Sequence, residues 1–278
     1  MSSNIRELVI EGAPARDLGA SVREIWVFRD TIRAFAERDV RVKYTQAVLG
    51  IAWAVIQPLT FMAIFTLTLG RLADVEGDGT TYAAFTLSAL VPWTFLSNGV
   101  SFGANGILAD AAMVRRVYFP REVPVLGAVG SASVDFAIGL ALFFVIGPLV
   151  GAHVTAWWLA APVLYLLLAF LAVAVATPLA AMNVYYRDFR FALPFGIQLW
   201  LFASPVAYPM STIDERWQPL YAALNPAAGI LDGFSNVLAR GWAPDMMLLG
   251  ISVASTSVIA VAGYYLFKRL EPSFADVI

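Results

Sequence analysis

The segment Glu37–Leu59 passes within a few residues from a cluster of cations to an uncharged apolar run. Arg38, Arg41 and Lys43 lie in its first part, and aromatic and aliphatic side chains fill its second part. A basic segment that leads directly into a hydrophobic run is typical of a chain that enters a lipid bilayer from the cytoplasm. The sequence therefore predicts a surface-lying segment before this junction and membrane-embedded chain after it.

The composition indicates that lipid is the solvent for most of the chain. Of the 278 residues, 60% are hydrophobic and 14% are charged, whereas soluble domains carry roughly 25% charged residues. A single soluble core could not absorb so much apolar surface. The absence of cysteine excludes disulfides, thiolate catalysis and thiolate metal sites. The single histidine argues against a histidine metal cluster or a catalytic triad.

Six apolar segments are long enough to be predicted as membrane spans. Several contain proline or glycine, which helices in bilayers tolerate where neighbouring helices satisfy the freed backbone groups. We therefore predict an all-α, polytopic membrane protein with a cytoplasmic tail and amphipathic helix in residues 1–45 and a six-span transmembrane domain in residues 46–278. The predicted spans are 48–69, 82–108, 123–150, 157–182, 191–209 and 246–267.

The distribution of cations predicts which loops face the cytoplasm. The polar segments before the first span, between spans two and three, between spans four and five, and after span six hold eight, three, two and two Lys or Arg residues. Only three of the 18 cations remain for the other loops. Because cytoplasmic loops carry the excess of Lys and Arg, we predict a multi-pass protein of the cytoplasmic (inner) membrane with both termini cytoplasmic.

Residues 21–41 have apolar side chains at three-to-four spacing, and charged side chains such as Arg33 occupy the other face. This pattern predicts an amphipathic helix. Such a helix lies in the membrane interface or packs on a partner protein, and the two placements are compatible.

Two short apolar pieces lie between the fifth and sixth predicted spans. They are Trp217–Leu224 and Ala227–Leu238, and Asn225–Pro226 separates them. Each piece is too short to cross a bilayer. We predict short re-entrant helices on the external side.

The sequence contains no phosphate-binding loop of the form GxxxxGK[ST], and no HExxH or GxSxG motif. We therefore predict a non-catalytic chain with no cofactor and no metal of its own. Asp135 is the one acid near the middle of a predicted span, whereas ion-coupled carriers place several ionisable groups there. Either Asp135 has a structural role, protonated or hydrogen-bonded to a hydroxyl such as Ser131 or Ser133, or it takes part in transport.

The segment Ala109–Pro124 places cations on both sides of an apolar, aromatic centre. A simple turn has no need of exposed aromatic residues, and aromatic residues with arginine are preferred anchors of protein interfaces. One reading is therefore a docking site for a partner protein. The alternative is positive-inside topology with contact to lipid headgroups.

Four motifs then occur in a fixed order along the chain: RDVRVKYTQAVLGIAWAVIQPL, MVRRVYFPREVPV, NVYYRDF and EPSFADVI. With the six-span layout, they resemble the permease subunit of the type 2 ABC exporters that move polysaccharides, the O-antigen and teichoic-acid exporter family. The resemblance covers about residues 20–278.

This resemblance implies two copies of the chain around a pore and two copies of a separate ATPase chain that binds ATP and Mg. The substrate would be a polyprenyl-diphosphate-linked glycan, with membrane lipids as the other contacts and no nucleic acid. In the family, the amphipathic helix and the loop between spans two and three contact the ATPase. The corresponding contacts here are Arg33, Arg115, Arg116, Tyr118 and Phe119.

The substrate path is expected beside the first and second spans. Arg38, Arg41 and Lys43 suit a diphosphate, although contact with lipid headgroups explains them equally well. Aromatic side chains offer flat faces to sugar rings, and for each of them lipid or core packing is the alternative. These aromatic candidates are Trp53, Phe61, Phe65, Trp93 and Phe95.

Three other functions fit the sequence less well. An ABC permease for a lipid or a drug shares the six-span layout. An ion-coupled carrier requires more buried charges than Asp135. A membrane glycosyltransferase requires acidic or metal-binding residues at the cytoplasmic face, where Asp110 and Asp188 are isolated from each other in sequence.

Overall fold

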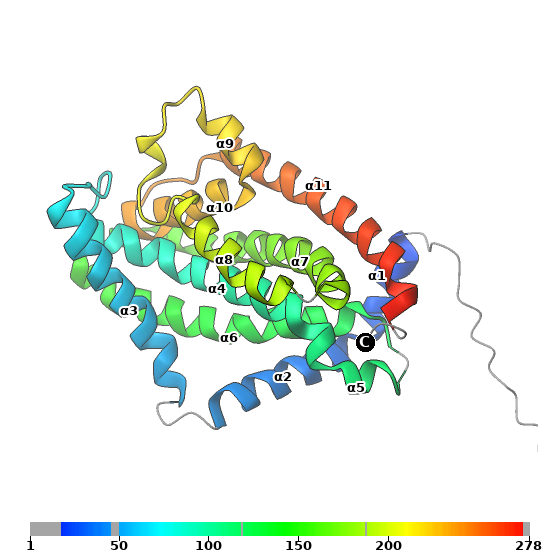
Figure 1. Cartoon of the computed structure of the whole chain (residues 1–278). Coiled ribbons are helices and arrows are strands. Elements are labelled where there is room, and N and C mark those ends of the chain that lie inside the picture. The colour runs from blue at the N-terminus through cyan, green and yellow to red at the C-terminus, as the bar shows by residue number, and fades with distance from the viewer. Residues whose placement is uncertain (1–17, 46–49, 118, 187, 275–278) are drawn as a thin grey trace, which may run out of the picture.

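A computed structural model describes residues 18–45, 50–117, 119–186 and 188–274, with side chains from residue 23 onward. Within these ranges all regular structure is helical, which confirms the all-α prediction. Figure 1 shows a bundle of long helices, with α2 and α5 toward one end and α9 at the other. The long helices are α1 Leu18–Val27, α2 Arg29–Thr45, α3 Trp53–Phe65, α4 Tyr82–Ala109, α6 Glu122–Ile146, α7 Ala161–Tyr185, α8 Phe189–Phe202, α10 Pro226–Ser235 and α11 Met246–Leu270.

Shorter helical pieces extend or connect these helices. Two of them are α-helical, α5 Ala111–Val114 and α9 Gln218–Leu224. The others are η1 Gly50–Ala52, η2 Thr66–Leu72, η3 Pro148–Val150, η4 Ala156–Ala160, η5 Met210–Thr212, η6 Asn236–Arg240 and η7 Glu271–Ser273.

Four helical stretches in the described part of the chain are long and apolar enough to cross a bilayer. They are Gly50–Leu72, Glu122–Ile146, Ala156–Tyr185 and Met246–Ser273. They correspond to the first, third, fourth and sixth predicted spans, so the multi-pass character is confirmed.

The second and fifth predicted spans have a different structure. Helix α4 has 28 residues, most of them buried among its neighbours. Helix α8 has 14 residues, which span about 21 Å at 1.5 Å per residue, less than the roughly 30 Å of a hydrocarbon core. The predicted span 191–209 is therefore too long, because its helix ends at Phe202. The six-span layout stays a prediction.

Helix α4 is the centre of the bundle and packs between α6 and α7. Small residues on α4 permit the close approach, as at Gly103, where an added Cβ atom would lie 2.7 Å from the Cβ of Ala176 in α7. Close helix packing through small residues is characteristic of membrane proteins. Helix α11 packs on the other side of α7, so α4, α6, α7 and α11 form the main body.

Hydrogen bonds join three connections at one end of this body: the α3–α4 loop, the α6–α7 connection and η6. Thr80 donates to the carbonyl of Gly151 at 2.9 Å, and Trp158 donates to the carbonyl of Leu238 at 3.1 Å. The other end carries α2, the segment 110–121 and the C-terminal end of α11; we call it the basic end. Successive loops thus lie at alternate ends, as a multi-pass chain requires.

Between α8 and α11 the chain forms the short helices α9 and α10, the latter continued by η6. All ten residues of α10 are buried, whereas α9 exposes Leu220 and Leu224. Their position relative to a bilayer stays a prediction.

Gly229 tests the packing of α10 on α11. A Cβ atom there would lie 2.6 Å from the carbonyl oxygen of Leu248, a backbone atom that cannot turn away. We expect Gly229→Ala to lower the free energy of unfolding by about 1–3 kcal/mol, the usual cost of overpacking. Thermal unfolding of the protein in detergent measures this loss.

Gly250→Ala is the matched control, because no heavy atom lies within 4 Å of a Cβ built at Gly250 of α11. Since alanine is the better helix former, this variant should be as stable as the parent or more stable. Equal melting temperatures for the two variants would contradict the close approach of α10 to α11.

Candidate functional site

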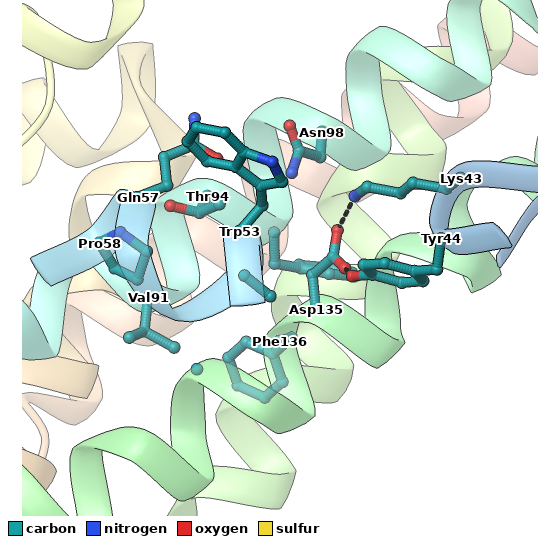
Figure 2. Close-up of a pocket in the computed structure, with 13 residues that line it drawn as sticks. Lys43, Tyr44, Trp53, Gln57, Pro58, Val91, Thr94, Asn98, Asp135 and Phe136 are labelled. Carbon is teal, nitrogen blue, oxygen red and sulfur yellow. Dashed lines mark hydrogen bonds and ion pairs between the residues drawn. The ribbon is translucent and has the colours of Figure 1, made fainter. Parts of the chain in front are cut away.

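One pocket brings together four of the residues predicted for the substrate path and the membrane interior. Lys43 at the end of α2, Trp53 in α3, Phe95 in α4 and Asp135 in α6 all line it. Figure 2 shows Trp53 and Asp135 on different helices around this space, with Lys43 reaching in from α2. The cavity volume is about 50 Å³, room for one or two water molecules.

Asp135 is buried and holds two partners from the end of α2 (Figure 2). Lys43 forms an ion pair with one carboxylate oxygen, and the Tyr44 hydroxyl donates a hydrogen bond to the other. Burial, together with this hydrogen bond, raises the pKa of Tyr44 above its usual range, so Tyr44 remains a neutral donor. The sequence-based view of Asp135 as a lone acid is therefore wrong.

The hydroxyls proposed for Asp135 serve other groups. Ser131 donates to the carbonyl of Ala128 at 2.7 Å, and Ser133 accepts from Tyr165 at 2.6 Å. An acid that meets a cation in a buried site costs far less than an unpaired one. Asp135 thus attaches α2 to α6.

The position of Asp135 along α6 explains how α2 must lie. Asp135 lies 13 positions after Glu122, the first residue of α6, which is about 20 Å along the helix axis. Lys43 and Tyr44 reach this depth because α2 packs along the first half of α6 (Figure 1). The Lys43 ammonium also lies over the ring of Phe102, 5.3 Å from its centre.

The pocket contains polar side chains that we did not predict from the sequence. Gln57 of α3 and Asn98 of α4 line it, and within the described ranges their amide groups have no hydrogen-bond partner. Trp53 beside them is 53% exposed. The sequence did contain a signal for these two residues, because each amide side chain interrupts a predicted apolar span.

Arg38 binds protein carboxylates. It makes two parallel bonds to Asp110, at 2.5 Å and 2.8 Å, and a further bond to Asp39 at 2.7 Å. The hydrogen bond to Asp110 raises the pKa of the Arg38 guanidinium above its usual range. The pair joins α2 to the end of α4, so Asp110 is not isolated in space. A diphosphate contact for Arg38 stays a prediction, as it does for Arg41, which is exposed.

Among the other predicted aromatic residues, Phe61, Phe65 and Trp93 do not line the pocket. Phe61 and Phe65 contact each other edge to face on α3, 6.2 Å apart. Trp93 is buried against Trp200 of α8, with ring centres 5.7 Å apart. Phe95 reaches the pocket wall but is fully buried between neighbouring rings. A sugar path along these rings stays a prediction.

Of the residues predicted to contact an ATPase, those that the structure describes lie at the basic end. Arg115 and Arg116 are exposed. Arg33 is also exposed and pairs with Glu37 at 2.7 Å. Phe119, expected at the surface, is instead buried against Phe35 of α2 at 5.8 Å. Tyr118 lies outside the described residues.

Comparison with known proteins identifies the family. Residues 31–239 match the family described as ABC-2 type transporter. The chain belongs to this family.

Relatives of this ABC-2 type transporter are named as O-antigen export permeases or as a polysialic acid transport protein. It is 28% identical over 258 residues to the O-antigen export system permease protein RfbA of Myxococcus xanthus, covering 92% of this chain and 98% of that protein. A Klebsiella pneumoniae protein of the same name is 21% identical over 90% of this chain and 95% of its own. The polysialic acid transport protein KpsM of Escherichia coli is 19% identical over 87% and 93%.

This ABC-2 type transporter carries a second buried charge cluster, at the end opposite the basic end, which sequence reasoning missed. Arg240 of η6 is 3% exposed and bonds to Asp232 at 3.1 Å and to Asn236 at 2.6 Å. It also pairs with Asp78 of the α3–α4 loop at 3.3 Å. The cluster joins η6 to that loop. Its one sequence signal is an arginine in a loop otherwise poor in cations.

In the described part of the chain, no group of three or more His, Cys, Asp or Glu side chains is placed to hold a metal ion. The candidate site is the pocket lined by the Lys43–Asp135 ion pair, Tyr44, the amides of Gln57 and Asn98, and the face of Trp53.

Lys43→Met tests the attachment of α2 to α6. Because Asp135 stays buried and loses its cation, we expect the free energy of unfolding to fall by about 1–3 kcal/mol, the cost of an unmade charged hydrogen bond reduced by the partial exposure of Lys43. The double variant Lys43→Met with Asp135→Asn should lose less than Lys43→Met alone. Chemical denaturation in mixed micelles measures both.

Glu37→Gln is the control on the same helix. Its partner Arg33 is 80% exposed, so the variant should stay within about 0.5 kcal/mol of the parent. A Lys43→Met variant as stable as Glu37→Gln would contradict the attachment.

Proposed function

We propose that this ABC-2 type transporter is the transmembrane subunit of an ATP-driven exporter that moves a polyprenyl-diphosphate-linked polysaccharide outward across the cytoplasmic membrane. The observation that carries the proposal is the similarity to polysaccharide-export permeases over almost the whole length of both chains. O-antigen, teichoic acid and similar envelope glycans form the substrate class.

The energy source in this proposal is a separate ATPase, present in two copies. The chain has no phosphate-binding loop of its own, so ATP and Mg bind to the partner. Arg115 and Arg116 support the contact site, because they are exposed at the basic end beside α2. Aromatic Tyr118 belongs to the same proposed surface.

A second copy of the chain completes the pore in this proposal. Few residues of α3 are fully buried within one chain, and Trp53, Phe61 and Ile64 are exposed. Helix α8 exposes Phe191, Phe195 and Phe202. Lipid and a second copy are the two surfaces that can cover such faces. With α4 and α8 counted as spans, the chain has six and both termini are cytoplasmic.

The pocket at Lys43 supplies chemistry that suits the substrate. An ammonium group binds phosphate oxygens, amides such as Gln57 and Asn98 bond to hydroxyls, and the exposed face of Trp53 packs on an apolar ring face. A cavity of about 50 Å³ is smaller than a sugar ring. A sugar therefore enters only when α3 separates from α4 and α6.

Two alternatives differ in what they transport. A lipid or drug permease shares the family and the helix layout. An ion-coupled carrier is disfavoured because Asp135 is paired with a cation and a phenol.

Removal of the chain from its cell distinguishes the polysaccharide exporter from these alternatives. We expect lipid-linked glycan to accumulate inside the cell and to return to the surface when the chain is restored; unchanged surface glycan would reject the proposal.

Charge reversal tests the proposed ATPase contact. Arg115→Glu with Arg116→Glu should abolish co-purification of the ATPase, because two cations of the contact become anions while the fold is untouched. Arg216→Glu is the control, since Arg216 is equally exposed but lies in the segment before α9. Full recovery of the ATPase with the double variant would count against this surface.

Single cysteines test the topology, because the chain has no native cysteine. Cysteines at Glu76 and Glu215 should react with an impermeant thiol reagent added outside the cell. Cysteines at Arg116 and Asp188 should react only after lysis. All four positions are exposed within the chain, and expression without the ATPase leaves the membrane as the barrier to the reagent. External labelling at Arg116 would reverse the proposed orientation.

A further inference from the structure

Two ion pairs hold the two ends of the segment 110–121, which carries the proposed ATPase contacts. The first joins Asp110 to Arg38 of α2. The second joins Glu122, the first residue of α6, to Lys268 of α11. We infer that the Glu122–Lys268 pair is a positioning device that makes α11 move together with this segment when the ATPase displaces it. The inference rests on the proposed function.

Glu122 is only 4% exposed although it is charged. One of its carboxylate oxygens accepts a bond from the Lys268 ammonium at 2.7 Å and another from the Tyr264 hydroxyl at 3.0 Å. Lys268 also bonds to Glu271 at 2.8 Å. Tyr264 and Lys268 are four residues apart and so share one face of α11. The start of α6 is thereby attached to α11 at two points.

The beginning of the segment is attached to a different helix. Arg38 binds Asp110 through two parallel bonds, a geometry that fixes orientation as well as distance. Phe119, near the other end of the segment, also makes an edge-to-face contact with Phe35 of α2. The segment therefore has α2 on one side and α11 on the other.

Between these attachments the segment has little structure of its own. Helix α5 has four residues, of which Val114 alone is buried. Arg115, Arg116 and Val117 are exposed. A force applied to the two arginines would bend a free loop of this kind. With both ends held by ion pairs, the force displaces α2 and α11 instead.

Stability alone is a weak reason for a buried ion pair, since apolar side chains of similar volume often pack equally well. Attachment in a defined direction is what the pair adds. Helix α11 then continues to the opposite end of the bundle, where it packs against α9 and α10. Through α11, a displacement at the basic end reaches the short helices at the other end.

The neutral variant Glu122→Gln with Lys268→Met and Glu271→Gln removes the ion pair without leaving a buried charge, because Glu271 is the other partner of Lys268. In the full complex we expect it to bind the ATPase and to keep basal ATP hydrolysis, because Arg115 and Arg116 are unchanged. Export of the lipid-linked glycan should fall roughly 2- to 30-fold, the range of measured coupling effects. Exchange of the charges, Glu122→Lys with Lys268→Glu, should restore export when Glu271→Gln is kept, since Glu271 would otherwise face the exchanged acid.

Export by the neutral variant at the parental rate would overturn the inference. So would equal losses in the neutral and the exchanged variants, because side-chain identity rather than the pair would then matter. The exposed pair Arg216–Asp214 supplies the control: Arg216→Met with Asp214→Asn should export normally.

A distance measurement tests the attachment without reference to any substrate. Spin labels on cysteines at Ala112, which is exposed on α5, and at Tyr265, which is exposed on α11, report the separation of the segment from α11. In complexes held in nanodiscs, we expect one narrow distance distribution for the parent and a broad one for the neutral variant. Identical distributions would overturn the inference even if the chain exports glycan, and a broadened one would support it even if the transported substrate proves different.

Discussion

The ion pair between Lys43 and Asp135 is the interaction on which the placement of α2 depends. A carboxylate about 20 Å along a membrane helix is costly unless it has a partner, and the end of α2 supplies both a cation and a phenol. With α2 held along α6, Arg38 of α2 pairs with Asp110. Phe119 packs against Phe35, also of α2. The exposed arginines of the segment 110–121 are thereby presented at a defined place on the basic end.

The bundle consists of a tightly packed main body and a periphery that is attached to it less closely. Helices α4, α6, α7, α10 and α11 bury one another, and ion pairs attach α2 and the loops to them. Helices α3 and α8 have few contacts within the chain and leave apolar faces uncovered. The small pocket lies where α3 meets the main body. Separation of α3 would enlarge it with the least loss of packing, which suits a path for a large glycan.

Properties that depend on local composition could be predicted from the sequence: the helical class and four apolar segments long enough to cross a bilayer. Side-chain pairings could not, because the partners of Arg38 and Lys43 are 72 and 92 residues away. The early end of α8 was readable, since Pro205 disfavours helix at the residue before it. The burial of Phe119 depends on Phe35 of α2, and hydrophobic pattern alone does not separate a docking aromatic from a packed one.

A cryo-electron microscopy structure of the chain with its ATPase in a lipid nanodisc tests the central claim most directly. The account predicts α2 along the first half of α6, with Lys43 bonded to Asp135 and the ATPase seated on the segment 110–121 at the same end. An α2 detached from α6, or an ATPase bound at the end that carries Arg240, would contradict it.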